Sequence, residues 1–135
     1  MAIQFSAAVR NARLDAIETA ISTSAVLKIR TGVAPANVAT ADSGTVLATV
    51  TLPSDWMAAA SGGSKAKSGT WQDSSADATG TAAHFRVYAS DGTTAHIQGT
   101  VTLTGGGGDM TVDNTSFASG QNFTVTGFTL TDGNA

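Results

Sequence analysis

The chain has two histidines, His84 and His96, and they are the first residues to consider for metal or acid–base chemistry. An alternating pattern predicts a β-hairpin in which both histidines lie on one face. A zinc site needs about three or four protein ligands, and Arg86 lies between the two histidines on that face, where it would repel a cation. We therefore predict no metal site here and assign both histidines to solvent or to an interface.

Two pairs of aspartates are the next candidates for chemistry. Asp73 and Asp77 form one pair, and Asp109 and Asp113 form the other. Calcium prefers about six to eight oxygen ligands from a dense acidic loop, and glycoside hydrolysis needs two carboxyl groups flanking a sugar. Both pairs are sparse and stand beside turn-forming residues, where aspartate is common. We expect turns here, with neither calcium nor catalysis.

A run of four glycines, Gly105 to Gly108, invites comparison with a phosphate-binding loop. The run is followed neither by Lys-Ser/Thr nor by a helical pattern, so it lacks the residues with which such loops hold phosphate. We predict a flexible turn. Serine is too abundant, and histidine too scarce, to define a Ser-His-Asp site. The sequence therefore predicts no enzyme and no cofactor.

Charge is distributed very unevenly along the 135 residues. After Arg86 there is no Lys, Arg or Glu, and the only charged residues there are four aspartates. This region consists largely of Thr, Gly, Ser and Val, which is typical of strands and tight turns. Charged residues make up 13% of the chain, about half the usual share, which suits a surface that packs against partners.

The overall charge and the apolar runs exclude several classes of partner. A net charge of −3 provides no basic field for nucleic acid. No run approaches the roughly 18 apolar residues of a membrane-spanning helix. Cysteine is absent, so disulfides are excluded.

The elements that would position these residues are one helix followed by strands. Leu14, Ile17 and Ile21 follow helical spacing from a plausible cap at Ser6, with Arg10, Arg13 and Glu18 expected on other faces. We predict an N-terminal helix or arm over residues 1–24 and a β domain over residues 25–135.

About seven short strands, separated by turn residues, predict a mainly β fold, an antiparallel β-sandwich behind the N-terminal α-helix. In the hairpin, a three-residue loop, Ser90-Asp91-Gly92, would pair Phe85 with Ile97 and Val87 with Ala95. Gly127 shifts the parity of the last strand and predicts a bulge. Residues 54–58 could form one helical turn, and Lys65 and Lys67 are expected on an exposed edge.

Three aromatic residues could form a sugar-stacking platform: Trp56, Trp71 and Tyr88. The alternative, which we favour, is that the two tryptophans anchor the core or a subunit contact.

Three blocks carry a resemblance to a known family. They are residues 27–53, LKIRTGVAPANVATADSGTVLATVTLP, residues 75–101, SADATGTAAHFRVYASDGTTAHIQGTV, and residues 111–135, TVDNTSFASGQNFTVTGFTLTDGNA. Together with the preceding helix they resemble a family of small proteins encoded in the virion-structure gene clusters of tailed phages and prophages. The resemblance covers almost the whole chain and implies a virion component, with no catalytic residue to carry over.

On this basis we expect a capsid decoration (cement) protein or minor head protein. It would assemble with the virion in the bacterial cytoplasm and bind the major capsid lattice as a homo-oligomer, for which we expect a trimer. Its N-terminal residues would serve as an arm. The alternative is a tail-fibre, baseplate or neck component whose β-sandwich binds a host glycan. The expected assembly contacts are Phe5, Leu14, Ile17, Ile21, Trp56 and Trp71.

Overall fold

The computed structural model describes residues 2–135, which fold into a mainly β structure with one N-terminal helix. Helix α1 spans Ala7–Ile21. The predicted cap is confirmed, because the Ser6 hydroxyl accepts a hydrogen bond from the backbone N–H of Val9 at 3.3 Å. The helix ends at Ser22, whose φ of 73° is incompatible with another helical turn.

Ten strands follow the helix, and eight of them belong to one mixed sheet. Its main path runs β2-β1-β6-β7-β8-β10-β3, with β4 also pairing with β10, while β5 and β9 form a separate two-stranded sheet. The strands are β1 (Val26–Arg30), β2 (Val46–Thr51), β3 (Ser64–Ala66), β4 (Gln72–Asp73), β5 (Gly80–Thr81), β6 (His84–Tyr88), β7 (Ala95–Leu103), β8 (Met110–Val112), β9 (Ser116–Phe117) and β10 (Phe123–Thr131).

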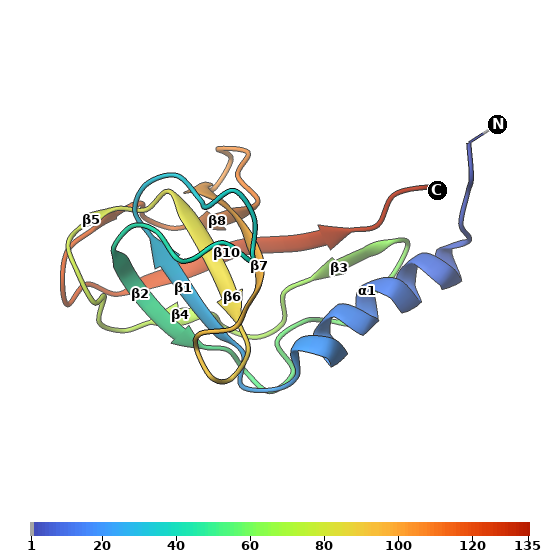
Figure 1. Cartoon of the computed structure of the whole chain (residues 1–135), viewed down its shortest axis with the longest axis horizontal. Helices are drawn as coiled ribbons and strands as arrows, with labels where there is room; N and C mark the ends of the chain where they lie inside the picture. Colours follow the sequence, from blue (N-terminus) through green and yellow to red (C-terminus); the bar gives the residue numbers. More distant parts are fainter. Residues whose placement is uncertain (1) are drawn as a thin grey trace.

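The long strand β10 connects two parts of the molecule. It pairs with β8 on one side and with β4 and β3 on the other. The predicted bulge is confirmed by a register shift between Val125 and Gly127, which lets Phe128 face the core like Val125. Figure 1 shows the end of β10, β3 and α1 lying beside one another as an extension from the other strands, with both termini at that end.

The core is built around a chain of contacting aromatic rings. Trp56 lies 6.1 Å from Trp71, Trp71 lies 5.5 Å from Phe128, and Phe128 lies 5.5 Å from Phe85, measured between ring centroids. These large rings supply buried apolar area that the alanine-rich composition otherwise lacks. The indole N–H of Trp56 donates to the backbone oxygen of Ser22 at 3.2 Å, so the end of α1 is held to the core.

The predicted hairpin exists, but the predicted register differs from the observed one by two residues. Val87 pairs with Ile97, and a bulge between Val87 and Tyr88 lets Tyr88 pair with Ala95. The loop is longer than three residues because the Asp91 carboxylate accepts the backbone N–H groups of Thr93 and Thr94. A shift of two residues preserves the facing of the side chains, which is why side-chain alternation alone could not distinguish the two registers.

Two further predictions about local structure are wrong. Strand β8 runs parallel to β7, so the sheet is mixed. After β7 the chain first returns to the level of Thr100, whose backbone N–H donates to Asp109, and only then does β8 run in the same direction as β7. Residues 54–58 form a turn followed by a bridge between Met57 and Lys67, because this segment pairs with the extended chain around β3.

The glycine run between β7 and β8 is required by close packing. A Cβ on Gly106 would lie 2.8 Å from Thr102 Cβ, and one on Gly108 would lie 2.8 Å from Thr102 Oγ1. The backbone N–H of Gly108 also donates to Thr102 Oγ1 at 3.0 Å. The run therefore folds back tightly over β7, and only residues without a side chain fit there.

Candidate functional site

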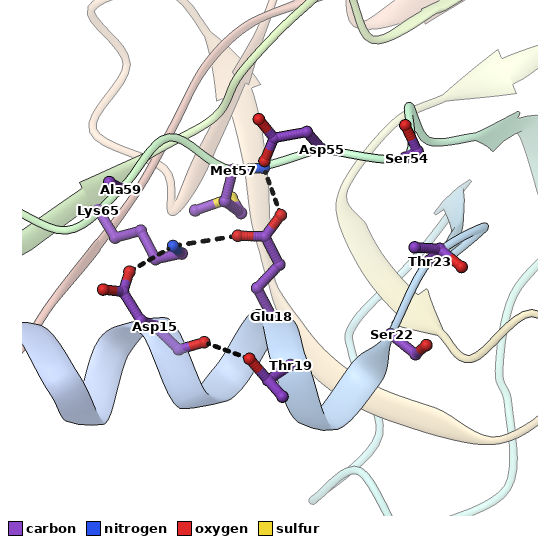
Figure 2. A pocket seen from close by; sticks show the side chains of 10 residues that line it. All are labelled: Asp15, Glu18, Thr19, Ser22, Thr23, Ser54, Asp55, Met57, Ala59 and Lys65. Carbon is purple, nitrogen blue, oxygen red and sulfur yellow. Dashed lines mark hydrogen bonds and ion pairs between the residues drawn. The ribbon is translucent and has the colours of Figure 1, made fainter.

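A pocket lies between α1 and the segment that leads into β3. It has a volume of about 550 Å³ and is lined by acidic, hydroxyl-bearing and apolar side chains around a single lysine, Lys65. Figure 2 shows Lys65 reaching between two helix carboxylates. Its ammonium group lies 2.7 Å from Asp15 Oδ1 and 3.1 Å from Glu18 Oε2.

Lys65 is fully engaged within the chain. Besides the two carboxylates, its Nζ donates to the backbone oxygen of Ala58 at 2.9 Å, so its three donors have three acceptors. Only 2% of the side chain is exposed. Burial disfavours the charged amine, but the hydrogen bonds to Asp15 and Glu18 outweigh it and raise the pKa of Lys65. The amine is therefore held as a cation and is not available as a nucleophile or base.

The same carboxylates also cover an open strand edge. Glu18 Oε1 accepts the backbone N–H of Met57 at 3.2 Å, and Asp15 Oδ1 accepts that of Ala60 at 3.0 Å. The hydrogen bonds from Lys65 and Ala60 lower the pKa of Asp15. The helix thus satisfies backbone donors that a neighbouring strand would otherwise pair. This arrangement joins α1 to the sheet, and we interpret the pocket as a structural junction.

A second group of charged residues lies under the loop over residues 31–45. Asp42 Oδ1 accepts from Arg86 Nη1 at 2.9 Å and from the hydroxyl of Tyr88 at 2.7 Å, and Asp42 Oδ2 accepts from Arg30 Nη2 at 2.9 Å. Partial burial raises the pKa of Asp42, but the Tyr88 hydrogen bond and the two guanidinium groups outweigh it, so the pKa lies below its usual value.

Further polar contacts hold the same loop in place. Arg86 donates to the backbone oxygen of Asn37 at 3.0 Å, and Gln98 Nε2 donates to that of Pro35 at 2.7 Å. His84 lies 2.8 Å through Nδ1 from the backbone oxygen of Gly32. Because a carbonyl only accepts, Nδ1 carries the proton. These side chains fix a loop to the outer face of β1, β6 and β7, although Arg30 Nε and His84 Nε2 are buried there without a hydrogen-bond partner.

Several expected positions of polar residues are corrected by this geometry. Lys65 is buried and paired, not on an exposed edge, and Arg86 is 2% exposed in the centre of a strand with both faces covered. His96 is exposed as expected, but the prediction for His84 is wrong, since it is buried under the loop. Glu18 lies on the inward face of α1 with Leu14, because it pairs with Lys65.

The sequence indicates where some of these paired charged residues lie, but not which partners they have. Asp15 and Glu18 follow Leu14 by one and four residues, so helical geometry places them on the same half of α1. Nothing local indicates their partner Lys65, which stands 50 residues after Asp15. The same holds for Asp42 and Arg86, which are 44 residues apart.

The residues expected to make assembly contacts lie mostly inside the chain. Leu14, Ile21, Trp56 and Trp71 are buried within the described fold, and Ile17 is partly buried against the core. Phe5 is half-buried beneath Arg13, whose guanidinium carbon lies 5.1 Å from the ring centroid. In this structure, the area that these buried side chains could offer to a partner is already covered by the chain itself.

A platform for sugar stacking is not formed by the three aromatic candidates. Trp56, Trp71 and Tyr88 are each 0% exposed, so none of them presents a ring face to a ligand.

Within residues 2–135, no group of three or more His, Cys, Asp or Glu side chains could hold a metal ion. The one helix of the described chain lacks the length and apolar character needed to cross a membrane.

The outward side of α1 is the least expected surface of the molecule. We call it the outward face and define it by six exposed residues without charge: Ala8, Val9, Ala12, Ala16, Thr19 and Ala20. The charged residues of the helix lie elsewhere. Arg13, at the border of this face, pairs with Asp132 through Nε at 3.1 Å. The helix therefore buries Leu14 and Ile21 as an ordinary surface helix does, but most of its charged groups pair with its own chain and its solvent side carries small uncharged residues.

Comparisons with protein-family models, with curated proteins and with solved structures find no match to this chain. The fold and the contacts described above therefore define its class: a mainly β protein with a docked N-terminal helix.

Proposed function

We propose that this chain is a structural component of a tailed-phage virion, a capsid decoration or minor head protein that binds the major capsid lattice and stabilises the particle. The observation that carries the proposal is the uncharged outward face of α1. Its ionised groups hold the chain together, while an uncharged face is left exposed. Such a face suits packing against other subunits, because no charge has to be desolvated when it is covered.

The buried polar residues give further support. Lys65 and Arg86 are the most buried cations of the chain, and both are saturated by structural contacts. A catalytic site would need groups poised to exchange protons or to attack a substrate. The resemblance of the three sequence blocks to virion-structure proteins supports the same conclusion.

The proposal is tested by locating the protein on purified particles from cells that carry its gene. Quantitative mass spectrometry should find it in hundreds of copies per particle, and immunogold labelling should mark heads. Labelling of tails at a few copies per particle would instead support the alternative, a tail-fibre, baseplate or neck component. Absence from particles would overturn both.

Binding to heads is then tested with a folded variant. Deleting residues 1–24 would also remove Asp15 and Glu18, the two carboxylates that pair with Lys65, and uncover the core beneath Leu14 and Ile21. A charge placed on the outward face, as in Ala16→Glu, preserves those pairs and is the sharper test of whether α1 contacts other subunits.

A further inference from the structure

The short connection between α1 and β1 contains two residues in an unfavourable backbone conformation. Among residues 2–135, three residues other than glycine have a positive φ, and two of them are Ser22, at 73°, and Ser24, at 58°. Ser22 also has a ψ of −171°. That combination of angles is essentially restricted to glycine, because a Cβ atom crowds the backbone there. The connection is therefore strained.

Contacts on both sides of the connection impose this conformation. The backbone N–H of Ser22 donates to the backbone oxygen of Glu18 at 2.8 Å, and its own carbonyl accepts from the indole N–H of Trp56 at 3.2 Å. Ala25, just before β1, is fully buried. The helix end and the start of the strand are both fixed, so residues 22–24 must span the space between them. Backbone strain persists where the surrounding structure determines it in this way.

Helix α1 is attached to the strands by few apolar residues. Leu14 and Ile21 are its buried residues, and of the two only Ile21 belongs to the main hydrophobic cluster. Much of the remaining attachment is polar, through the carboxylates of Asp15 and Glu18. Water replaces hydrogen bonds of this kind when they break, so each contributes little net free energy. Figure 1 shows α1 beside β3 and the end of β10, extending away from the other strands.

We propose that α1 is a strap that opens as a unit by rotation about residues 22–24, and that the strain in this connection lowers the free energy of opening. When α1 leaves the strands, Ser22 and Ser24 return to ordinary backbone conformations, which offsets part of the contacts that are lost. The inference goes beyond the proposed function, because it describes a motion within one chain and needs no second molecule.

Opening changes the surface that the molecule presents. In the closed position, Glu18 accepts the backbone N–H of Met57 at 3.2 Å, and Asp15 accepts that of Ala60 at 3.0 Å. In the open position these donors face water, so a strand edge that the helix covers becomes accessible. The helix also loses its support, and an isolated helix of about 15 residues is only marginally stable in water. The strap therefore switches the molecule between a covered and an uncovered strand edge.

The first experiment is native-state hydrogen exchange of the purified chain. In the wild type, the amides of α1 and those of Met57 and Ala60 should exchange through one common opening, at least about tenfold faster than the amides of β1 and β6. Ser22→Gly removes the Cβ atom that is crowded in the closed position and should slow this opening about three- to thirtyfold. Ser22→Ala keeps the Cβ atom and should exchange as the wild type does.

A glycine elsewhere controls for the general effect of the substitution. Ser119 is exposed in a turn and has no positive φ, so Ser119→Gly should leave the exchange of α1 unchanged. Two results would overturn the proposal. One is exchange of α1 at the same rate as β1 and β6, and the other is a Ser22→Gly variant that opens as readily as the wild type.

The second experiment is limited digestion with trypsin, which cuts after Lys and Arg. Helix α1 contains Arg10 and Arg13, and Lys28 and Arg86 lie in strands. A protease cuts a helix only after it has opened, so the first cuts should fall at Arg10 and Arg13, and Ser22→Gly should delay them by a similar factor. First cuts in the strands, or cuts in α1 at equal rates in both proteins, would contradict the strap. Both experiments use the chain without phage particles, so their failure would leave the virion assignment standing.

Discussion

At the scale of single residues, Asp42 joins the loop over residues 31–45 to two strands of the sheet. Its carboxylate accepts from Arg30, Arg86 and Tyr88, which come from two neighbouring strands. Arg86 is 2% exposed in its side chain and Asp42 is 36% exposed. The pair therefore joins a buried cation to a carboxylate at the boundary with solvent, where the loop over residues 31–45 closes.

We predict that Asp42→Asn lowers the free energy of unfolding by about 2–3 kcal/mol, since an amide leaves the buried Arg86 without its counter-charge. The partial exposure of Asp42 keeps the effect at the low end of the range for buried pairs. Urea unfolding monitored by tryptophan fluorescence measures the change. Asp55→Asn is the control, because Asp55 is exposed and lines the pocket beside α1, away from the network around Asp42; equal effects of the two substitutions would refute the assigned role.

At the scale of elements, α1 is attached to the sheet by polar contacts around Lys65 as well as by apolar packing. Leu14 and Ile21 add buried apolar area, but the inward face also carries Asp15 and Glu18, which pair with Lys65 and with backbone N–H groups. The stability of the junction should therefore depend on one cation.

Lys65→Met should loosen this junction, because methionine keeps the volume of lysine but leaves two carboxylates facing each other. We expect amide hydrogen exchange in α1 and residues 57–61 to accelerate roughly 10- to 100-fold, with β1 and β6 little changed. Lys67→Met is the matched control, since Lys67 donates to Gly69 at an exposed site. Exchange that is unchanged in α1, or that accelerates equally in every strand, would contradict a local role for Lys65.

The turn between β7 and β8 gives a second prediction about an element. Gly106→Ala should destabilise the fold by about 1–3 kcal/mol, because the added methyl group would overlap Thr102. Gly133→Ala is the control, since nothing lies within 4 Å of its added Cβ. Thermal unfolding of both variants measures the difference, and a Gly106 variant as stable as the control would show that the turn can relax.

How much of this fold the sequence could predict depends on how far apart in the sequence the interacting residues stand. The cap at Ser6, the helix and the bulge at Gly127 are set by residues a few positions apart, and all three were predicted. The hairpin register was missed because a shift of two residues leaves every side chain on the same face of the sheet. The parallel pairing of β7 with β8 and the burial of Lys65 and Arg86 depend on contacts that no local pattern encodes. The inward position of Asp15 and Glu18 could have been found by placing them on the same half of the helix as Leu14.

At the scale of the whole molecule, the buried network predicts how stability responds to pH. The pKa of Asp42 lies below its usual value, and that of Asp15 is lowered by the hydrogen bond from Lys65. In the unfolded chain these groups take up protons near pH 3.9, whereas the folded chain keeps them ionised to lower pH. The unfolded state thus binds more protons as the pH falls. The free energy of unfolding should therefore decrease below about pH 5.

The free energy of unfolding should also decrease at alkaline pH, because there the folded state keeps a proton that the unfolded state loses. Burial and the hydrogen bond to Asp42 raise the pKa of Tyr88, so the folded chain keeps the phenol neutral while the unfolded chain loses the proton near pH 10. Stability should therefore be greatest between about pH 5 and 9 and fall on both sides. Urea titrations from pH 3 to 11 measure both limbs. Tyr88→Phe should reduce the alkaline limb and, by removing a hydrogen-bond donor to Asp42, weaken the acid limb as well. Asp42→Asn should reduce the acid limb and, by removing the acceptor of the phenol, the alkaline limb as well. Identical profiles for the wild type and both variants would show that this network does not set the pH range over which the chain stays folded.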